Sequence, residues 1–65
     1  MRDEIMEIQQ LLNNLGFNAG SDDGLAGSRT HTAIRAFQKE NSLPPDGYPS
    51  PALLKLLRSL LIAPF

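Results

Sequence analysis

The most constraining stretch of this chain is a turn that leads directly into an amphipathic helix. The turn opens with Asp23-Gly24, a strong turn dipeptide, because the carboxylate accepts nearby backbone N–H groups and glycine tolerates positive φ. Gly27 marks a second point where the backbone needs freedom or a close approach. We therefore expect a helix over residues 28–41 and expect the rest of the chain to sandwich it. The face predicted to be buried carries Thr30, Ala33, Ile34 and Phe37, which follow helical spacing.

A first helix is predicted before this turn, over residues 4–15. Asp3 is positioned to be its N-cap, and Gly16 is expected to end it as a left-handed C-cap residue. Phe17 is expected to fold back onto the end of this helix. Its apolar stripe consists of Ile5, Ile8, Leu12 and Leu15.

A third helix is predicted after a second turn that contains Asp46-Gly47. Ser50-Pro51 has the residue types of an N-cap followed by the first helical position, and Pro64 ends the helix at the latest. Leucines give this helix a broad apolar face. The fold predicted is therefore all-α: a compact three-helix bundle with two Asp-Gly turn loops, forming one domain over residues 1–65 with its core in 4–60.

Composition excludes several functional classes. The 65-residue chain has 6 Lys plus Arg against 7 Asp plus Glu, a net charge of −1, so it lacks the basic excess of nucleic-acid-binding proteins. No apolar run approaches the ~20 residues of a membrane span, and the chain contains no cysteine. We expect a monomer without a cofactor or a bound metal ion. On composition alone the chain could be a cytosolic protein, or equally a piece excised from a longer protein.

A weak internal repeat relates the two turns. The dipeptides Asp23-Gly24 and Asp46-Gly47 are offset by 23 residues, and each follows one predicted helix and precedes another. The same offset places Thr30 over Leu53. Two helix–turn units that share the central helix would form a compact domain with local contacts.

The start of the second helix is the best candidate binding site. Free N–H groups at Gly27, Ser28 and Arg29, together with the Arg29 guanidinium, would suit an anion such as a carboxylate. Thr30 is expected to clip the loop to the helix, through loop backbone near residues 23–27 or a carbonyl one turn back. Tyr48 either offers an aromatic surface to a sugar or peptide, or covers the edge of the core.

Catalysis by this chain alone is not expected. His31 is the only histidine and is interpreted as an exposed surface residue, because no motif supplies a partner nucleophile or second ligand. The loop before Gly24 lacks the acidic positions of an EF-hand, which excludes calcium on sequence grounds. Asp23 and Asp46 are explained by turn chemistry.

Taken together, these residues resemble the peptidoglycan-binding domain that is appended to bacterial cell-wall hydrolases. The resemblance covers residues 5 to about 57, and the Asp46–Leu54 segment is similar to the tail of lytic murein transglycosylases. The chain departs from the family pattern at Ser28, Ser50 and Leu53. The matching motifs are Ile5-x-x-Ile8-Gln9-x-x-Leu12-x-x-Leu15-Gly16-Phe17, Asp23-Gly24-x-x-Gly27-x-x-Thr30-x-x-Ala33-Ile34-x-x-Phe37-Gln38 and Leu43-x-x-Asp46-Gly47.

The resemblance implies a non-catalytic module that binds the glycan or stem peptide of peptidoglycan and tethers a covalently linked enzyme to the wall. It implies a place in the periplasm, the cell envelope or outside the cell, as part of a larger bacterial protein. A protein-docking or spacer role through the third helix and the C-terminal tail is the alternative. A shallow polar groove is expected, made of loop N–H groups at residues 25–28, amides such as Gln38 and Asn41, and one or two arginines. The predicted ligand residues are Leu25, Gly27, Ser28, Arg29, Gln38, Asn41 and Tyr48. The predicted turn residues are Asp23, Gly24, Thr30, Asp46 and Gly47.

Overall fold

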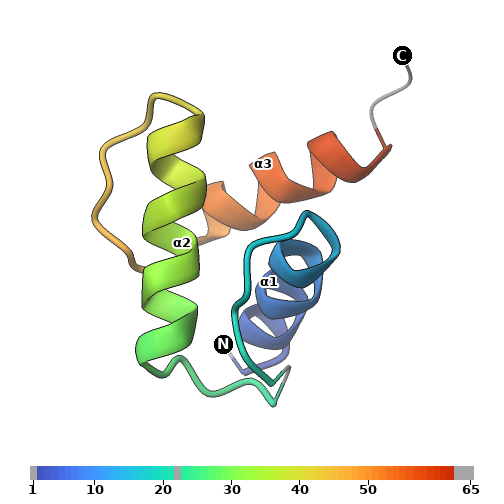
Figure 1. The fold of residues 1–65 in the computed structure, drawn as a ribbon. Helices are drawn as coiled ribbons and strands as arrows, with labels where there is room; N and C mark the ends of the chain where they lie inside the picture. The colour runs from blue at the N-terminus through green and yellow to red at the C-terminus, as the bar shows by residue number, and fades with distance from the viewer. Residues whose placement is uncertain (1, 22, 63–65) are drawn as a thin grey trace.

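The computed structural model of the protein describes residues 2–21 and 23–62, and within these it contains three helices and no strand. Helix α1 spans Arg2–Asn14, α2 spans Ser28–Glu40 and α3 spans Pro51–Ile62. Figure 1 shows α2 standing beside α1, with α3 directed away from α2 across the molecule. The all-α three-helix bundle is thus confirmed. None of the helices in this part of the chain has the length and apolar character needed to cross a membrane.

The helix boundaries follow the local signals at most ends. Helix α2 begins at Ser28 as predicted, and α3 begins at Pro51, where the Ser50 hydroxyl accepts the Leu53 N–H at 3.1 Å as an N-cap. Helix α1 begins at Arg2, so the predicted N-cap role of Asp3 is wrong. Asp3 lies within the first turn, where its carboxylate still favours the positive end of the helix dipole. The predicted stop at Pro64 lies outside the described residues.

Helices α1 and α2 end in the same way, with a residue in the left-handed region. Gly16 has φ +92°, and the N–H of Phe17 reaches back to the Leu12 carbonyl at 2.9 Å, which confirms the predicted C-cap. Ser42, with φ +58°, takes this position after α2, and the N–H of Leu43 reaches the Gln38 carbonyl at 2.8 Å. These turns direct the chain back, so that Phe17 and Leu43 pack against the core.

One hydrophobic core unites the three helices. Phe37 is 1% exposed and meets Phe17 edge to face, with ring centroids 5.8 Å apart. Helix α1 packs against both α2 and α3, whereas no comparably close backbone approach joins α2 to α3 within the described residues. The expectation that the second helix is sandwiched is therefore wrong: α1 is the helix shared by the other two. The buried apolar residues that form this core are Ile8, Leu11, Leu12, Ala19, Ala33, Ile34, Phe37, Leu53, Leu54 and Leu57.

An exposed ion pair joins α1 to α3 at the surface. Arg58 donates two hydrogen bonds to the Glu7 carboxylate, at 2.7 and 2.6 Å. These bonds lower the pKa of Glu7 and raise that of Arg58. Because both side chains are in contact with water, the pair contributes little to stability compared with the core.

The first turn is held by a buried glutamine of α1. Gln9 is 1% exposed, and its Oε1 accepts the Gly24 N–H at 3.0 Å while its Nε2 donates to the Leu25 carbonyl and to the Thr30 hydroxyl, both at 2.9 Å. The Thr30 hydroxyl donates in turn to the Ala19 carbonyl at 3.0 Å, so its partner lies earlier in the loop than residues 23–27. The amide of Gln9 thus fixes both the turn and the start of α2.

Gly24 fits this place for two reasons. Its φ of +82° is rarely adopted by residues with a side chain, and a Cβ atom there would lie 2.9 Å from the Arg2 carbonyl oxygen and would collide with the Arg2 side chain. The neighbouring Asp23 accepts the Leu25 N–H through Oδ1 at 2.9 Å, which closes an Asx turn.

The second turn repeats this arrangement with a glutamine of α2. The Oε1 atom of Gln38 accepts the Gly47 N–H at 2.9 Å, and its Nε2 donates to Asp46 Oδ1 at 2.9 Å. Asp46 Oδ1 also accepts the Tyr48 N–H at 3.0 Å. Both hydrogen bonds lower the pKa of the Asp46 carboxyl because they stabilise its charged form. The bond from the Tyr48 N–H has the larger effect, and the bond from the Gln38 amide has the second largest.

We predict that Phe37→Ala destabilises the domain by about 3–5 kcal/mol, because it removes a fully buried ring and its contact with Phe17. That loss is enough to unfold much of a domain of this size. Thermal and urea unfolding followed by circular dichroism measure it. Leu60→Ala, which truncates a side chain that is 41% exposed, is the control. Equal melting temperatures for Phe37→Ala and the wild type would contradict the core placement.

We predict that Gln9→Leu destabilises the fold by at least about 1–3 kcal/mol, since it leaves the buried Gly24 N–H without an acceptor. Amide hydrogen exchange at Gly24 should accelerate more than exchange in the middle of α2. Asn14→Leu, at an exposed position of the same helix, is the matched control. A Gly24 amide that stays equally protected in Gln9→Leu would show that the glutamine does not hold the turn.

We predict that Asp46→Asn flattens the acid limb of the stability curve. The pKa of Asp46 is lower in the folded state than its ordinary value of 3.8, so below pH 4 the unfolded chain binds more protons and stability falls as pH falls. This contribution is complete above the ordinary pKa and is lost as pH drops through the folded-state pKa. Urea midpoints of wild type and variant from pH 2 to 6 measure it, and parallel curves would refute it.

Candidate binding site

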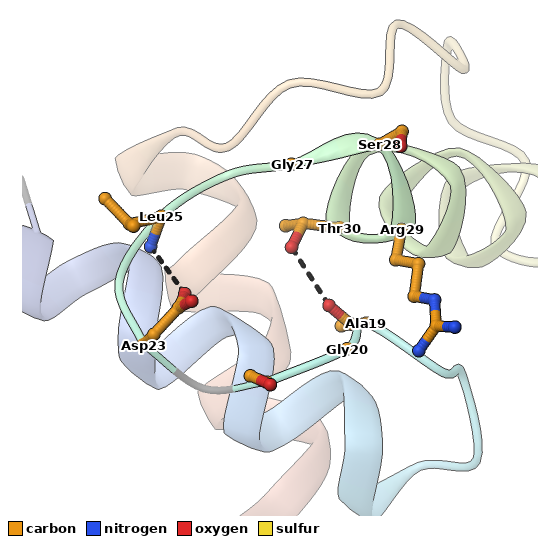
Figure 2. A pocket seen from close by; sticks show the side chains of 9 residues that line it. Ala19, Gly20, Asp23, Leu25, Gly27, Ser28, Arg29 and Thr30 are labelled. Carbon is orange, nitrogen blue, oxygen red and sulfur yellow. Dashed lines mark hydrogen bonds between the residues drawn. The ribbon is translucent and has the colours of Figure 1, made fainter.

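A pocket lies between the loop that follows α1 and the first turn of α2. Its volume is about 260 Å³. Figure 2 shows Asp23 and Leu25 on one side of it and Arg29, extending from α2, on the other. Four of the predicted ligand residues therefore share one pocket: Leu25, Gly27, Ser28 and Arg29. The remaining lining residues are Ala19, Gly20, Ser21, Asp23 and Thr30.

The first turn of α2 supplies hydrogen-bond donors to this pocket. Gly27 takes an extended conformation, with φ −92° and ψ −171°, and α2 has no side-chain N-cap. The first helical hydrogen bond runs from the His31 N–H to the Gly27 carbonyl at 3.0 Å, so the N–H groups of Ser28, Arg29 and Thr30 have no acceptor within the helix. These donors lie at the positive end of the helix dipole, where a negatively charged group is stabilised.

Arg29 adds a full positive charge on one side of the pocket. A Cβ atom placed on Gly20 would lie 3.4 Å from both Cβ and Cδ of Arg29, so the arginine stem runs along the glycine backbone. Figure 2 shows this side chain beside Ala19 and Gly20, across the pocket from Asp23. The pocket therefore places a cation and helix N–H donors opposite a carboxylate. That arrangement suits a ligand that carries both an anionic group and N–H donors, as a peptide does.

The other three predicted ligand residues lie outside this pocket. Gln38 is 7% exposed, and its amide is bonded within the second turn. Asn41 caps the opposite end of α2, about 20 Å from Ser28 along the helix axis, and its side chain donates to the Phe37 carbonyl at 2.9 Å. Tyr48 is 66% exposed on the second turn. Gln38, Asn41 and Tyr48 thus lie apart from the pocket at the start of α2, and ligand contact by these three residues stays a prediction.

Several residues that build the site were missed by the sequence analysis. Gln9 lies on the buried stripe of α1, next to Ile8, and a polar residue at such a position is the signal that could have revealed it. Residues 19–21 line the pocket but lie in an irregular loop with no periodic signal. His31, expected to be an exposed surface residue, is only partly exposed: its Nδ1 donates to the Gly47 carbonyl at 2.6 Å.

A second pocket, of about 210 Å³, lies at the start of α3. The offset of 23 residues maps Arg29 onto Ala52 and Thr30 onto Leu53, so the second pocket has lost the cation and the hydroxyl and is mainly apolar. Six lining residues of the first pocket have their counterparts in the second, namely Gly20, Ser21, Asp23, Gly27, Arg29 and Thr30 opposite Leu43, Pro44, Asp46, Ser50, Ala52 and Leu53. Among the described residues, no cluster of three or more His, Asp or Glu side chains is arranged to hold a metal ion.

Comparison with known proteins identifies the family of this chain. Residues 1–57 match the family model described as "Putative peptidoglycan binding domain". The chain is also similar to the N-acetylmuramoyl-L-alanine amidase CwlM of Mycobacterium tuberculosis, at 38% identity over 55 residues. That match covers 85% of this chain and 14% of the amidase.

Solved structures agree with this assignment. Crystal structures of SltB3 from Pseudomonas aeruginosa, in complex with NAG-anhNAM-pentapeptide and with NAG-NAM-pentapeptide, each match with a TM-score of 0.84 and 47% identity. Each match covers 88% of this chain and 15% of SltB3, so the chain spans about one seventh of the length of these relatives. The extent of the family match and the shared fold together show that this chain belongs to the peptidoglycan-binding domain family.

Proposed function

We propose that the chain is a non-catalytic module that binds peptidoglycan through the pocket at the start of α2. The observation that carries the proposal is that Arg29 and the first turn of α2, which has no side-chain cap, line the same pocket. Family membership supports this function, as do the muropeptide fragments that the two SltB3 structures contain.

The chemistry of the pocket favours the stem peptide as its ligand. A carboxylate of the peptide would lie against Arg29 and the N–H groups of Ser28 and Arg29, as a charge-assisted contact at a helix N-terminus. N–H donors of the same peptide would face Asp23 on the opposite side. The contact is small and open to water, so we expect weak binding, with a Kd between about 1 μM and 1 mM.

Weak binding is sufficient for a tethering role. We propose that the module is linked to a wall-degrading enzyme, and a lytic murein transglycosylase is the partner that the sequence resemblance favours. Once the module is bound to the wall, the active site of the linked enzyme encounters the peptidoglycan bonds that it cleaves at a high effective concentration. This role places the protein in the cell envelope, in the periplasm or on the outer side of the membrane.

Co-sedimentation with purified sacculi tests the proposal. We predict that the folded wild-type chain sediments with sacculi and that Arg29→Ala reduces the bound fraction by roughly tenfold, at an unchanged melting temperature, because a charged contact is lost. Lys55→Ala removes a positive charge from an exposed position on α3 and serves as the matched control.

The sacculi are stripped of protein, so binding to them also separates wall binding from docking onto another protein through α3. Absence of co-sedimentation for the folded wild type would overturn wall binding. Equal losses for Arg29→Ala and Lys55→Ala would show that the pocket is not the site and that the contact depends only on overall charge.

A further inference from the structure

The second turn carries an exposed aromatic side chain that lies outside the pocket at the start of α2. Tyr48 is 66% exposed, the highest value among the large hydrophobic side chains that the structure describes, and it lines neither pocket. Leu25, at 61% exposed, follows it in this ranking and occupies the same place in the first turn, directly after Asp-Gly. Each turn therefore holds an apolar side chain out into solvent at an equivalent position.

The backbone and neighbours of Tyr48 hold it in place despite this exposure. Its N–H is bonded to the Asp46 carboxylate at 3.0 Å. Its ring meets the His31 ring at a centroid distance of 5.2 Å and an interplanar angle of 72°, and the Gly47 carbonyl fixes that imidazole through Nδ1 at 2.6 Å. An aromatic ring that is ordered before binding loses little conformational entropy when a ligand covers it.

Two polar side chains lie near the second turn. The Arg35 guanidinium lies over Gly47, since a Cβ atom there would be 3.0 Å from Arg35 Nη2 and 3.4 Å from Cζ. His31 contributes an imidazole beside the ring. The exposed Tyr48 ring thus has an imidazole in contact with it and a guanidinium at the adjacent Gly47.

We propose that Tyr48, in contact with His31 and next to the Gly47 backbone that Arg35 covers, is a stacking platform for a pyranose ring of the glycan strand. A sugar ring has C–H groups on one face and polar groups around its rim, and that distribution complements a flat ring with polar neighbours. An apolar peptide side chain would need enclosing walls, which this open surface lacks.

This proposal rests on the proposed function and extends it. The pocket and the platform flank the same end of α2, because Arg29 lines the pocket and His31, two residues later, contacts Tyr48. The pocket would take the peptide and the platform would take the sugar. Two modest contacts on one polymer bind more tightly than either alone.

The single tyrosine gives a direct probe, since the chain has one Tyr and no Trp. We predict that a peptide-free N-acetylglucosamine oligomer changes the tyrosine fluorescence of the full chain on titration. Calorimetry should give roughly tenfold weaker oligomer binding for Tyr48→Ala, near-wild-type binding for Tyr48→Phe, which keeps the ring, and unchanged binding for Arg29→Ala. Leu60→Ala removes another exposed apolar side chain and is the matched control.

The outcomes separate the two proposals. Sacculus binding without any oligomer binding, or oligomer binding that Tyr48→Ala leaves unchanged, would overturn the platform while wall binding stands. Oligomer binding that depends on Tyr48, without sacculus binding, would support the platform and overturn wall tethering. Parallel losses for Tyr48→Ala and Tyr48→Phe, with both variants folded, would refute stacking in favour of a contact made by the hydroxyl.

Discussion

Two buried glutamine amides hold the loops of this small domain in place. Gln9 and Gln38 each accept the N–H of a glycine in an Asx turn, at 3.0 and 2.9 Å. A buried polar group without a partner would be costly, so each turn has one conformation in which the amide is satisfied. The positions of the pocket and of the exposed Tyr48 both depend on this constraint, because each lies on backbone that belongs to one of the two turns.

The sequence predicts the regular parts of the fold for identifiable physical reasons. Ser50 and Pro51 signal the start of α3, because the Ser50 hydroxyl accepts a backbone N–H of the first turn. Gly16 signals the end of α1, because glycine readily adopts the left-handed conformation that closes a helix. At the start of α1 the signal misleads, because Asp3 is a residue type that suits both the N-cap and the first turn, and it lies in the first turn of a helix that begins at Arg2. Periodicity shows that Phe37 is buried, but it does not show which helix covers it. The central position of α1 was therefore not predictable.

The candidate binding site likewise has one side that the sequence predicts and one side that it does not. Its α2 side, with Ser28 and Arg29, follows from a turn that leads into a helix, since every helix N-terminus has free N–H groups. Its other side, formed by residues 19–21, depends on the path of an irregular loop and on the long-range bond from Thr30 to Ala19. The separation of Asn41 from the pocket follows directly from helix length.

The contact between Gly24 and the start of α1 has a mechanical consequence. Arg2 Nε donates to the Asp23 carbonyl at 3.3 Å, and the Arg2 backbone lies close against Gly24. A force applied at Arg2 would therefore act on the turn that frames the pocket as well as on α1, which carries part of the core. The first residue of α1 and the frame of the candidate site thus share the same few atoms, so a displacement of Arg2 would change the shape of the pocket.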